Sequence, residues 1–394
     1  MIKIIYRYRV IILLFFLIES FDIKSQEKCD YPSDKNIYTR AQTDSLLSKK
    51  PDRLVGYRTN QSGYLSKILE DGTDVTDTTY TIEQVKIFSD GYKINGWLYL
   101  PRGKGRFPLV ILTNGGGNNV KSIRSFSDWL APVLAHCGIA AFVHDKRGTG
   151  ESEGSFVKTT YEDYITDAGN CAKYFAKDKR IDPGRIGVAG ASEGGRVAVV
   201  AACRYDEIKF VVSFAGTVVS AIDDRINAQK SWLRSLEIPD SSFDEVMSVH
   251  EKSIRAWASG DVKKHQDVDR QINEMRKRYE NDILPFPKSE MDTIKDFEIV
   301  IPTWNSLSMD YLKELEHFNK NWLAIFGELD AVVPTCASVK NICHYMKISG
   351  NNNYRIALIP DCGHSPVSVN TKRMIRLDNI IINWINENIN NIDE

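Results

Sequence analysis

The chain has 394 residues, 42% of them hydrophobic and 26% charged, which is enough to bury the core of one large domain with an insertion, or of two domains. Its 51 basic and 52 acidic side chains nearly cancel, leaving a formal net charge of −1. Nucleic-acid binding requires a basic surface, and no long basic tract stands out, so we expect no nucleic-acid partner.

The first 25 residues have the pattern of a secretory signal peptide. Lys3, Arg7 and Arg9 form a basic start, and the apolar residues 10–18 follow. A membrane-spanning helix needs about 20 mostly apolar residues, more than this run supplies. We therefore expect a signal peptide over residues 1–25, export to the periplasm or the medium, and no stable membrane span once the signal is removed.

Residues 26–80 are polar and carry few strand signals, so we interpret them as a lead-in segment that partly covers the core. Strands and helices then alternate over residues 81–216 and again over 310–394, which is typical of a mostly parallel sheet with helices on both faces. The predicted strands are residues 81–88, 93–100, 109–113, 140–144, 186–189, 210–214, 322–326 and 354–359. The first two alternate apolar and polar side chains, which favours an antiparallel pair near the sheet edge.

Helical patterns separate these strands. They cover residues 122–136, 161–176, 193–203, 337–346 and 373–387. Residues 217–309 break the alternation, because they are charged, helix-patterned and without a convincing buried strand. An insertion of this length late in an α/β sheet predicts a helical cap over the carboxyl ends of the strands, where such sheets bind ligands.

The pattern Gly-x-Ser-x-Gly occurs twice, around Ser152 and around Ser192. A nucleophilic serine of this type needs a sharp turn between a strand and a helix, so that its hydroxyl stands beside a helix N-terminus. Ser192 has this setting, because a strand pattern precedes it and a helix of small residues follows. Ser152 lies in a glycine-rich loop with no strand directly before it, so we interpret it as a loop-structuring residue and Ser192 as the nucleophile.

A serine hydroxyl also needs a base to remove its proton. His364 directly follows the last predicted strand, which places it at the same sheet edge as Ser192. The other six histidines fall in strand or helix patterns or in and around the cap, and we interpret them as surface or packing residues: His136, His144, His250, His265, His317 and His344.

The acid that orients the imidazole should follow another strand. Asp330 meets this condition. We favour it over Glu328, which has the setting of a turn residue, and over Asp361, which is too near His364 in sequence to orient it easily.

The negative oxygen of a tetrahedral intermediate needs two preorganised N–H donors. One is expected from the backbone of Glu193, the residue after the nucleophile. The other is expected from Gly116, in the glycine-rich loop after the third strand, because glycines let the backbone approach a substrate closely.

These motifs, in this order, resemble the α/β-hydrolase superfamily from about residue 82 to the end of the chain. Within it, the chain looks most like capped carboxylesterases and the related serine aminopeptidase and monoacylglycerol-lipase group. The segments that carry the resemblance are residues 114–117, 145–152, 190–195, 327–330 and 363–364. The resemblance implies an eight-stranded α/β-hydrolase fold with a cap, and a structural role for the 145–152 loop. One departure is Asn114, which stands where these families usually have histidine.

The expected activity is hydrolysis of a small acyl ester through an acyl-enzyme on Ser192, with no metal and no organic cofactor. One alternative is a peptidase or amidase on the same fold, with a cap carboxylate such as Asp223, Asp224 or Glu245 binding a peptide terminus. Another is an inactive binding module, against which the complete and correctly ordered Ser, Asp and His argue. The sequence does not indicate the oligomeric state.

The chain has seven cysteines, an odd number for a protein that enters an oxidising compartment. Cys137, Cys171 and Cys203 fall within or at the ends of apolar helical patterns, so we interpret them as buried thiols. Cys336 and Cys362 lie in two loops that we expect to meet near the active site, and we hypothesise a disulfide between them.

Overall fold

A computed structural model describes residues 29–48, 57–59, 63–68, 74–116, 124–235, 240–259, 261–278 and 306–389. The predicted signal peptide lies outside the described residues. Within those ranges, no helix combines the length and the apolar character that crossing a membrane would require.

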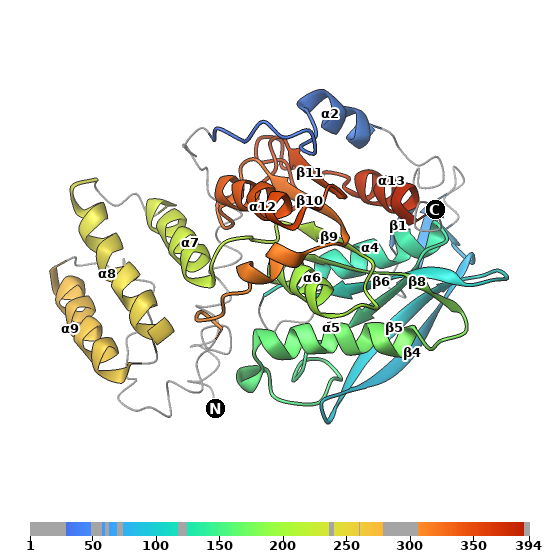
Figure 1. Cartoon of the computed structure of the whole chain (residues 1–394), viewed down its shortest axis with the longest axis horizontal. Coiled ribbons are helices and arrows are strands. Elements are labelled where there is room, and N and C mark those ends of the chain that lie inside the picture. Colours follow the sequence, from blue (N-terminus) through green and yellow to red (C-terminus); the bar gives the residue numbers. More distant parts are fainter. Residues whose placement is uncertain are drawn as a thin grey trace.

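An eight-stranded sheet with the strand order β11-β10-β9-β8-β6-β7-β5-β4 forms the centre of the molecule (Figure 1). Strands β4 and β5 pair antiparallel, β5 also pairs antiparallel with β7, and every other neighbouring pair is parallel. The mostly parallel sheet and the antiparallel pair at its edge are therefore confirmed. The bounds are β4 Tyr80–Ser89, β5 Tyr92–Pro101, β6 Phe107–Thr113, β7 Ala140–His144, β8 Ile181–Ala191, β9 Phe210–Phe214, β10 Asn321–Gly327 and β11 Tyr354–Ile359.

Five helices pack on this sheet: α4 (Ser125–His136), α5 (Tyr161–Phe175), α6 (Glu193–Arg204), α12 (Thr335–Ser349) and α13 (Asp378–Ile389). Phe210 and Phe214 point to the same face of β9, since side chains alternate along a strand. They contact Trp384 of α13 and Phe126 of α4, which places these two helices on one face. Helices α5 and α6 pack against each other in front of the sheet in Figure 1.

The prediction that the last helix begins at residue 373 is wrong, because α13 begins at Asp378. The backbone before it pairs with a neighbouring loop instead. Ser368 N–H donates to the Arg373 carbonyl at 2.8 Å, and Ile375 N–H donates to the Pro366 carbonyl at 2.8 Å. These contacts use backbone groups that an extra helical turn would need.

The lead-in segment contains more regular structure than the sequence analysis predicted. Helix α2 (Arg40–Ser48) is followed by a small antiparallel sheet of β1 (Tyr57–Thr59), β2 (Leu65–Ile68) and β3 (Asp74–Thr76). Just before α2, Ile37 bridges Ile356 of β11, with Tyr38 N–H donating to the Ile356 carbonyl at 2.9 Å. The segment thus covers part of the exposed edge of the main sheet, where unpaired backbone groups would otherwise face solvent.

Three helices fill the described part of the predicted cap: α7 (Ala221–Ser235), α8 (Asp240–Ser259) and α9 (Val262–Arg278). They lie at one end of the molecule in Figure 1. They share an apolar cluster of their own, in which Leu233, Val246 and Ile272 are buried. Residues 279–305 lie outside the described ones, so the bounds 217–309 of the cap stay a prediction.

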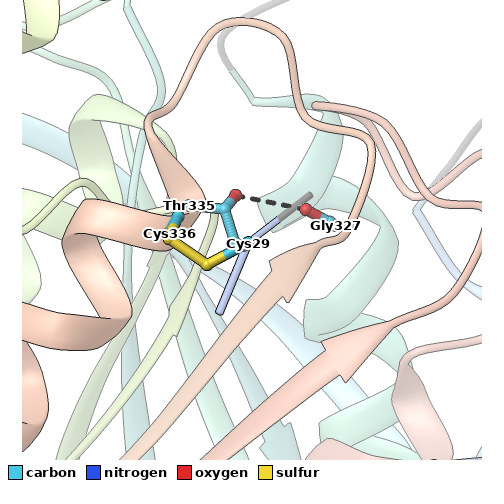
Figure 2. Close-up of a disulfide and its surroundings, with 4 residues drawn as sticks. All are labelled: Cys29, Gly327, Thr335 and Cys336. Atoms are coloured by element: carbon cyan, nitrogen blue, oxygen red, sulfur yellow. Dashed lines mark hydrogen bonds between the residues drawn. A yellow bond between two sulfur atoms is a disulfide. The ribbon is translucent and has the colours of Figure 1, made fainter. Parts of the chain in front are cut away.

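A disulfide joins the lead-in segment to α12, and it differs from the one hypothesised. Cys29 pairs with Cys336 (Figure 2), with 5.8 Å between their Cα atoms. Cys362 is buried and in no disulfide. Burial raises the pKa of the Cys362 thiol to about 12, so this group stays protonated and unreactive. Sequence alone does not determine which cysteines pair, and here the partner comes from a segment 307 residues away.

We expect the Cys29→Ser substitution to lower the free energy of unfolding by about 2–5 kcal/mol, because the disulfide closes a long loop of the unfolded chain. Urea denaturation of the oxidised proteins would measure this. The matched control is Cys203→Ser, a cysteine that is in no disulfide. Equal stability of wild type and Cys29→Ser, or two free thiols at these positions in oxidised wild type, would contradict the pairing.

Candidate active site

Ser192 lies alone between β8, which ends at Ala191, and α6, which begins at Glu193. Its φ of 55° and ψ of −123° are strained for a residue with a side chain, at a cost of about 1–3 kcal/mol. The turn is held on both sides: Ser192 N–H donates to the Phe214 carbonyl at 2.9 Å, and the Ser192 carbonyl accepts from Arg196 N–H at 3.2 Å. Its hydroxyl thus stands at the carboxyl end of a central strand, as predicted from the sequence.

Two glycines allow this turn. A Cβ atom at Gly190 would overlap the Thr113 side chain and the Gly194 backbone, and one at Gly194 would overlap the carbonyl oxygens of Thr113 and Asn114. The start of α6 therefore packs directly against the end of β6. This contact brings Glu193 and the 114–116 loop to the same place.

His364 connects Ser192 to Asp330. Its Nε2 lies 3.0 Å from Ser192 Oγ, and its Nδ1 lies 2.9 Å from Asp330 Oδ2. The three residues follow the ends of β8, β10 and β11. These strands run parallel in one sheet, with β9 between β8 and β10, so all three residues lie at the same edge of the sheet. The structure brings together all three residues that the sequence analysis singled out.

The Asp330 carboxylate is held rigidly. Its Oδ1 accepts N–H bonds from Val332 at 2.8 Å and from Val333 at 2.9 Å, and the residue is 1% exposed. A buried carboxylate fixed in this way can orient the imidazole with its Nδ1–H toward the acid, which leaves Nε2 to accept a proton from the serine.

The two rejected acids have other partners. The Glu328 carboxylate lies 3.5 Å from the Arg40 guanidinium. The Asp361 carboxylate accepts the Ser368 hydroxyl and, at 3.0 Å, the Asn370 N–H, and so supports the loop that carries His364.

Ser152 lies in a buried structural network. Its hydroxyl donates to the Asp145 carbonyl at 2.9 Å and accepts from Asn95 N–H at 2.9 Å. The Asp145 carboxylate in turn accepts from Arg124 at 3.2 Å and from Glu151 N–H at 3.1 Å. This loop ties β7 to β5, and Ser152 is one of its internal contacts, as the sequence analysis proposed.

The loop that carries Gly116 follows β6 and is anchored through Asn114. The Asn114 side chain donates to the His144 carbonyl and accepts from the Ser127 hydroxyl at 3.1 Å. Asn114 thus bonds the end of the neighbouring strand β7. Burial lowers the pKa of the adjacent His144 imidazole, which keeps it neutral in the core.

Lys146 is the site residue that the sequence analysis missed. Its ammonium donates to the Gly115 carbonyl and forms an ion pair with the Glu193 carboxylate. The signal in the sequence was a lysine two residues after the predicted strand 140–144, within a loop that was assigned a structural role as a whole.

The described residues contain no cluster of three or more His, Cys, Asp or Glu side chains that could hold a metal ion.

A serine on a strand–turn–helix, bonded to a histidine that is bonded to a carboxylate, on a mostly parallel sheet, defines an α/β hydrolase. The chain belongs to the family described as serine aminopeptidase, S33, whose model matches residues 107–368.

Among curated proteins, the chain is similar to the thiohydrolase aneE of Aspergillus aculeatus, at 34% identity over 125 residues, or 32% of this chain and 38% of that protein. It is also similar to YitV of Bacillus subtilis, which is named as an esterase, at 30% identity over 36% of this chain and 57% of that protein. YuxL of the same organism, named as a peptidase, is 29% identical over 37% of this chain and 24% of its own length. The chain spans less than two thirds of each of these relatives.

Solved structures that share the fold include the following two. The structure of the DcsB complex with its substrate analogue has a TM-score of 0.51 at 17% identity, covering 79% of this chain and 100% of that one. The α/β hydrolase GrgF from Penicillium sp. sh18 has a TM-score of 0.51 at 14% identity, covering 79% of this chain and 99% of its own. At these identities the likeness concerns the fold alone.

We expect Ser152→Ala to lower the free energy of unfolding by about 1–3 kcal/mol, because it leaves the buried Asn95 N–H and Asp145 carbonyl without this partner. Urea denaturation would measure the change. Ser48→Ala, at an exposed serine, should change stability by less than about 0.5 kcal/mol. A Ser152→Ala protein as stable as this control would contradict the structural role.

Proposed function

We propose that this hydrolase cleaves carboxylic esters of small molecules, with Ser192 as nucleophile, His364 as base and Asp330 as the orienting acid. The observation that carries the proposal is the pair of hydrogen bonds on His364, at 3.0 Å to Ser192 and 2.9 Å to Asp330. A neutral imidazole held between a hydroxyl and a buried carboxylate can take the serine proton as the serine attacks a carbonyl carbon.

In the proposed reaction, Ser192 Oγ bonds to the ester carbonyl carbon and its proton passes to His364 Nε2. The resulting oxyanion is bound by the backbone N–H groups of Gly116 and Glu193. As the intermediate collapses, the C–O bond to the alcohol breaks and His364 returns the proton to the leaving oxygen. Water then attacks the acyl-enzyme by the same route and releases the acid.

Two cap carboxylates bear on the choice between esters and peptides. Asp224 of α7 accepts from the buried Arg196 at 2.6 Å, and Asp223 accepts from the Ser220 hydroxyl at 2.6 Å. Because Arg196 already neutralises Asp224, this carboxylate is poorly suited to bind a peptide amino terminus. This argues against Asp224 as the group that would bind a peptide terminus, and the esterase-named relative supports the ester proposal. The aminopeptidase alternative keeps the support of the family description and of the peptidase-named relative.

We also propose that the protein is exported. The basic and apolar start of the chain supports this, since it is typical of a signal peptide. The Cys29–Cys336 disulfide supports it as well, because disulfides persist in oxidising compartments and are rare in the cytosol.

The direct test is hydrolysis of p-nitrophenyl esters from acetate to palmitate by wild type, Ser192→Ala and Ser152→Ala. We expect wild type to turn over at least one ester, Ser192→Ala to lose that activity, and folded Ser152→Ala to keep it. A fluorophosphonate probe should label wild type and not Ser192→Ala. Turnover of aminoacyl-arylamides without any ester turnover would replace the ester proposal by the peptidase one, and absence of both labelling and turnover would favour a binding module.

A second test concerns the acid. Asp330→Asn should lower kcat by about 10³–10⁴-fold, because the amide stabilises the wrong imidazole tautomer. Glu328→Gln is the matched control in the same loop, where the side chain is 35% exposed, and it should change kcat by less than about twofold. Equal losses in the two variants would contradict the assignment of Asp330.

A further inference from the structure

Lys146 is a buried cation with three partners at the edge of the site. It is the second residue after β7, and its side chain is 3% exposed. Its ammonium contacts the Gly115 carbonyl, the Glu193 carboxylate and, at 4.7 Å from the ring centroid, the face of Tyr164. An ammonium is costly to bury, and these three contacts compensate that cost.

We propose that Lys146 is the positioning residue of the oxyanion hole, holding the Gly115–Gly116 peptide directly and the start of α6 through the side chain of Glu193. The inference rests on the proposed function, in which Gly116 and Glu193 supply the N–H donors. Lys146 reaches both of them: it bonds the carbonyl of the peptide that contains Gly116 N–H, and it pairs with the side chain of Glu193.

The planarity of the peptide bond explains the effect on Gly116. The described residues contain no cis peptide bond, and in a trans peptide the carbonyl and the following N–H point in opposite directions. Because the Gly115 carbonyl is drawn toward Lys146, Gly116 N–H is directed away from it. Two successive glycines can rotate this peptide at little cost, so an external anchor is needed to keep one orientation.

The Glu193 carboxylate connects Lys146 to the second N–H donor of the proposed oxyanion hole. It is 7% exposed and lies at the first position of α6, directly after Ser192. Its pairing with Lys146 ties the start of the helix to the loop after β6, beside the close backbone contact at Gly194. It also neutralises the ammonium locally, so Lys146 acts by fixing geometry more than by adding positive charge to the oxyanion.

The first variant is Lys146→Met, which replaces the ammonium by an apolar chain of similar length beside a small cavity lined by Thr113, Tyr164 and Val197. We expect kcat for the best p-nitrophenyl ester to fall about 10- to 100-fold, while KM stays within about threefold. This fall in kcat is no larger than the fall that follows removal of a whole oxyanion-hole donor. Affinity for a trifluoromethyl ketone analogue should fall in parallel with kcat. Lys146→Arg, which keeps donors, should recover part of the loss.

A double variant, Lys146→Met/Glu193→Leu, distinguishes a loss of kcat caused by a misplaced oxyanion hole from one caused by lower stability of the fold. Lys146→Met alone leaves Glu193 buried without its ion-pair partner and should be less stable, whereas Lys146→Met/Glu193→Leu removes both charges and should regain stability. We expect the double variant to unfold near the wild-type urea midpoint while its kcat stays low. Lys320→Met, at an ion pair with Asp206, serves as control and should keep wild-type kcat.

The outcomes distinguish this inference from the proposed function. If wild type is active, Ser192→Ala is inactive, and Lys146→Met or the stable double variant keeps wild-type kcat, the positioning role is overturned and the proposed function stands. A fall in kcat that vanishes when stability returns in the double variant also overturns it. If wild type hydrolyses no ester and no probe labels Ser192, both proposals fail.

Discussion

The strained turn at Ser192 is the constraint on which the rest of the site depends. A residue with a side chain holds a φ of 55° there because the Phe214 carbonyl and the Arg196 N–H fix its two peptide groups. The glycines on either side let α6 begin in direct contact with the end of β6. That single close approach sets the distance between nucleophile and oxyanion loop, and any bulkier residue would push the two apart.

The loop after β7 is connected to this turn, and to helix α5, by buried charged side chains. Arg147 forms a buried ion pair with Asp167 of α5, at 2.8 Å, which secures the loop to the helix layer. Lys146, one residue earlier, contacts the Gly115 carbonyl and the Glu193 carboxylate. Two adjacent cations thus face different partners, one structural and one at the site. Such a network is costly unless every group is paired, which explains why so many partners converge on one short loop.

The loop that carries Asp330 is stabilised by a different part of the chain. The loop between β10 and α12 carries Asp330, and its end is closed by the Thr335 hydroxyl, which donates to the Gly327 carbonyl at 3.1 Å (Figure 2). Cys336, the next residue, is joined to Cys29. The lead-in segment therefore covers the β11 edge and is covalently attached beside the acid loop, so it stabilises the side of the molecule on which the imidazole is oriented.

The sequence by itself determined the strands of the main sheet and the choice of Ser192 over Ser152, because both follow from short-range patterns. It also determined that Ser192, Asp330 and His364 converge, because parallel strands present their carboxyl ends at one edge of the sheet. It did not determine the β1–β3 sheet, whose strands are three or four residues long and carry too little pattern. The cysteine pairing and the contacts of Lys146 were decided only by the tertiary structure. Cys29 and Cys336 are 307 residues apart, and Lys146 reaches groups 31 and 47 residues away, so only the folded chain brings these partners within bonding distance.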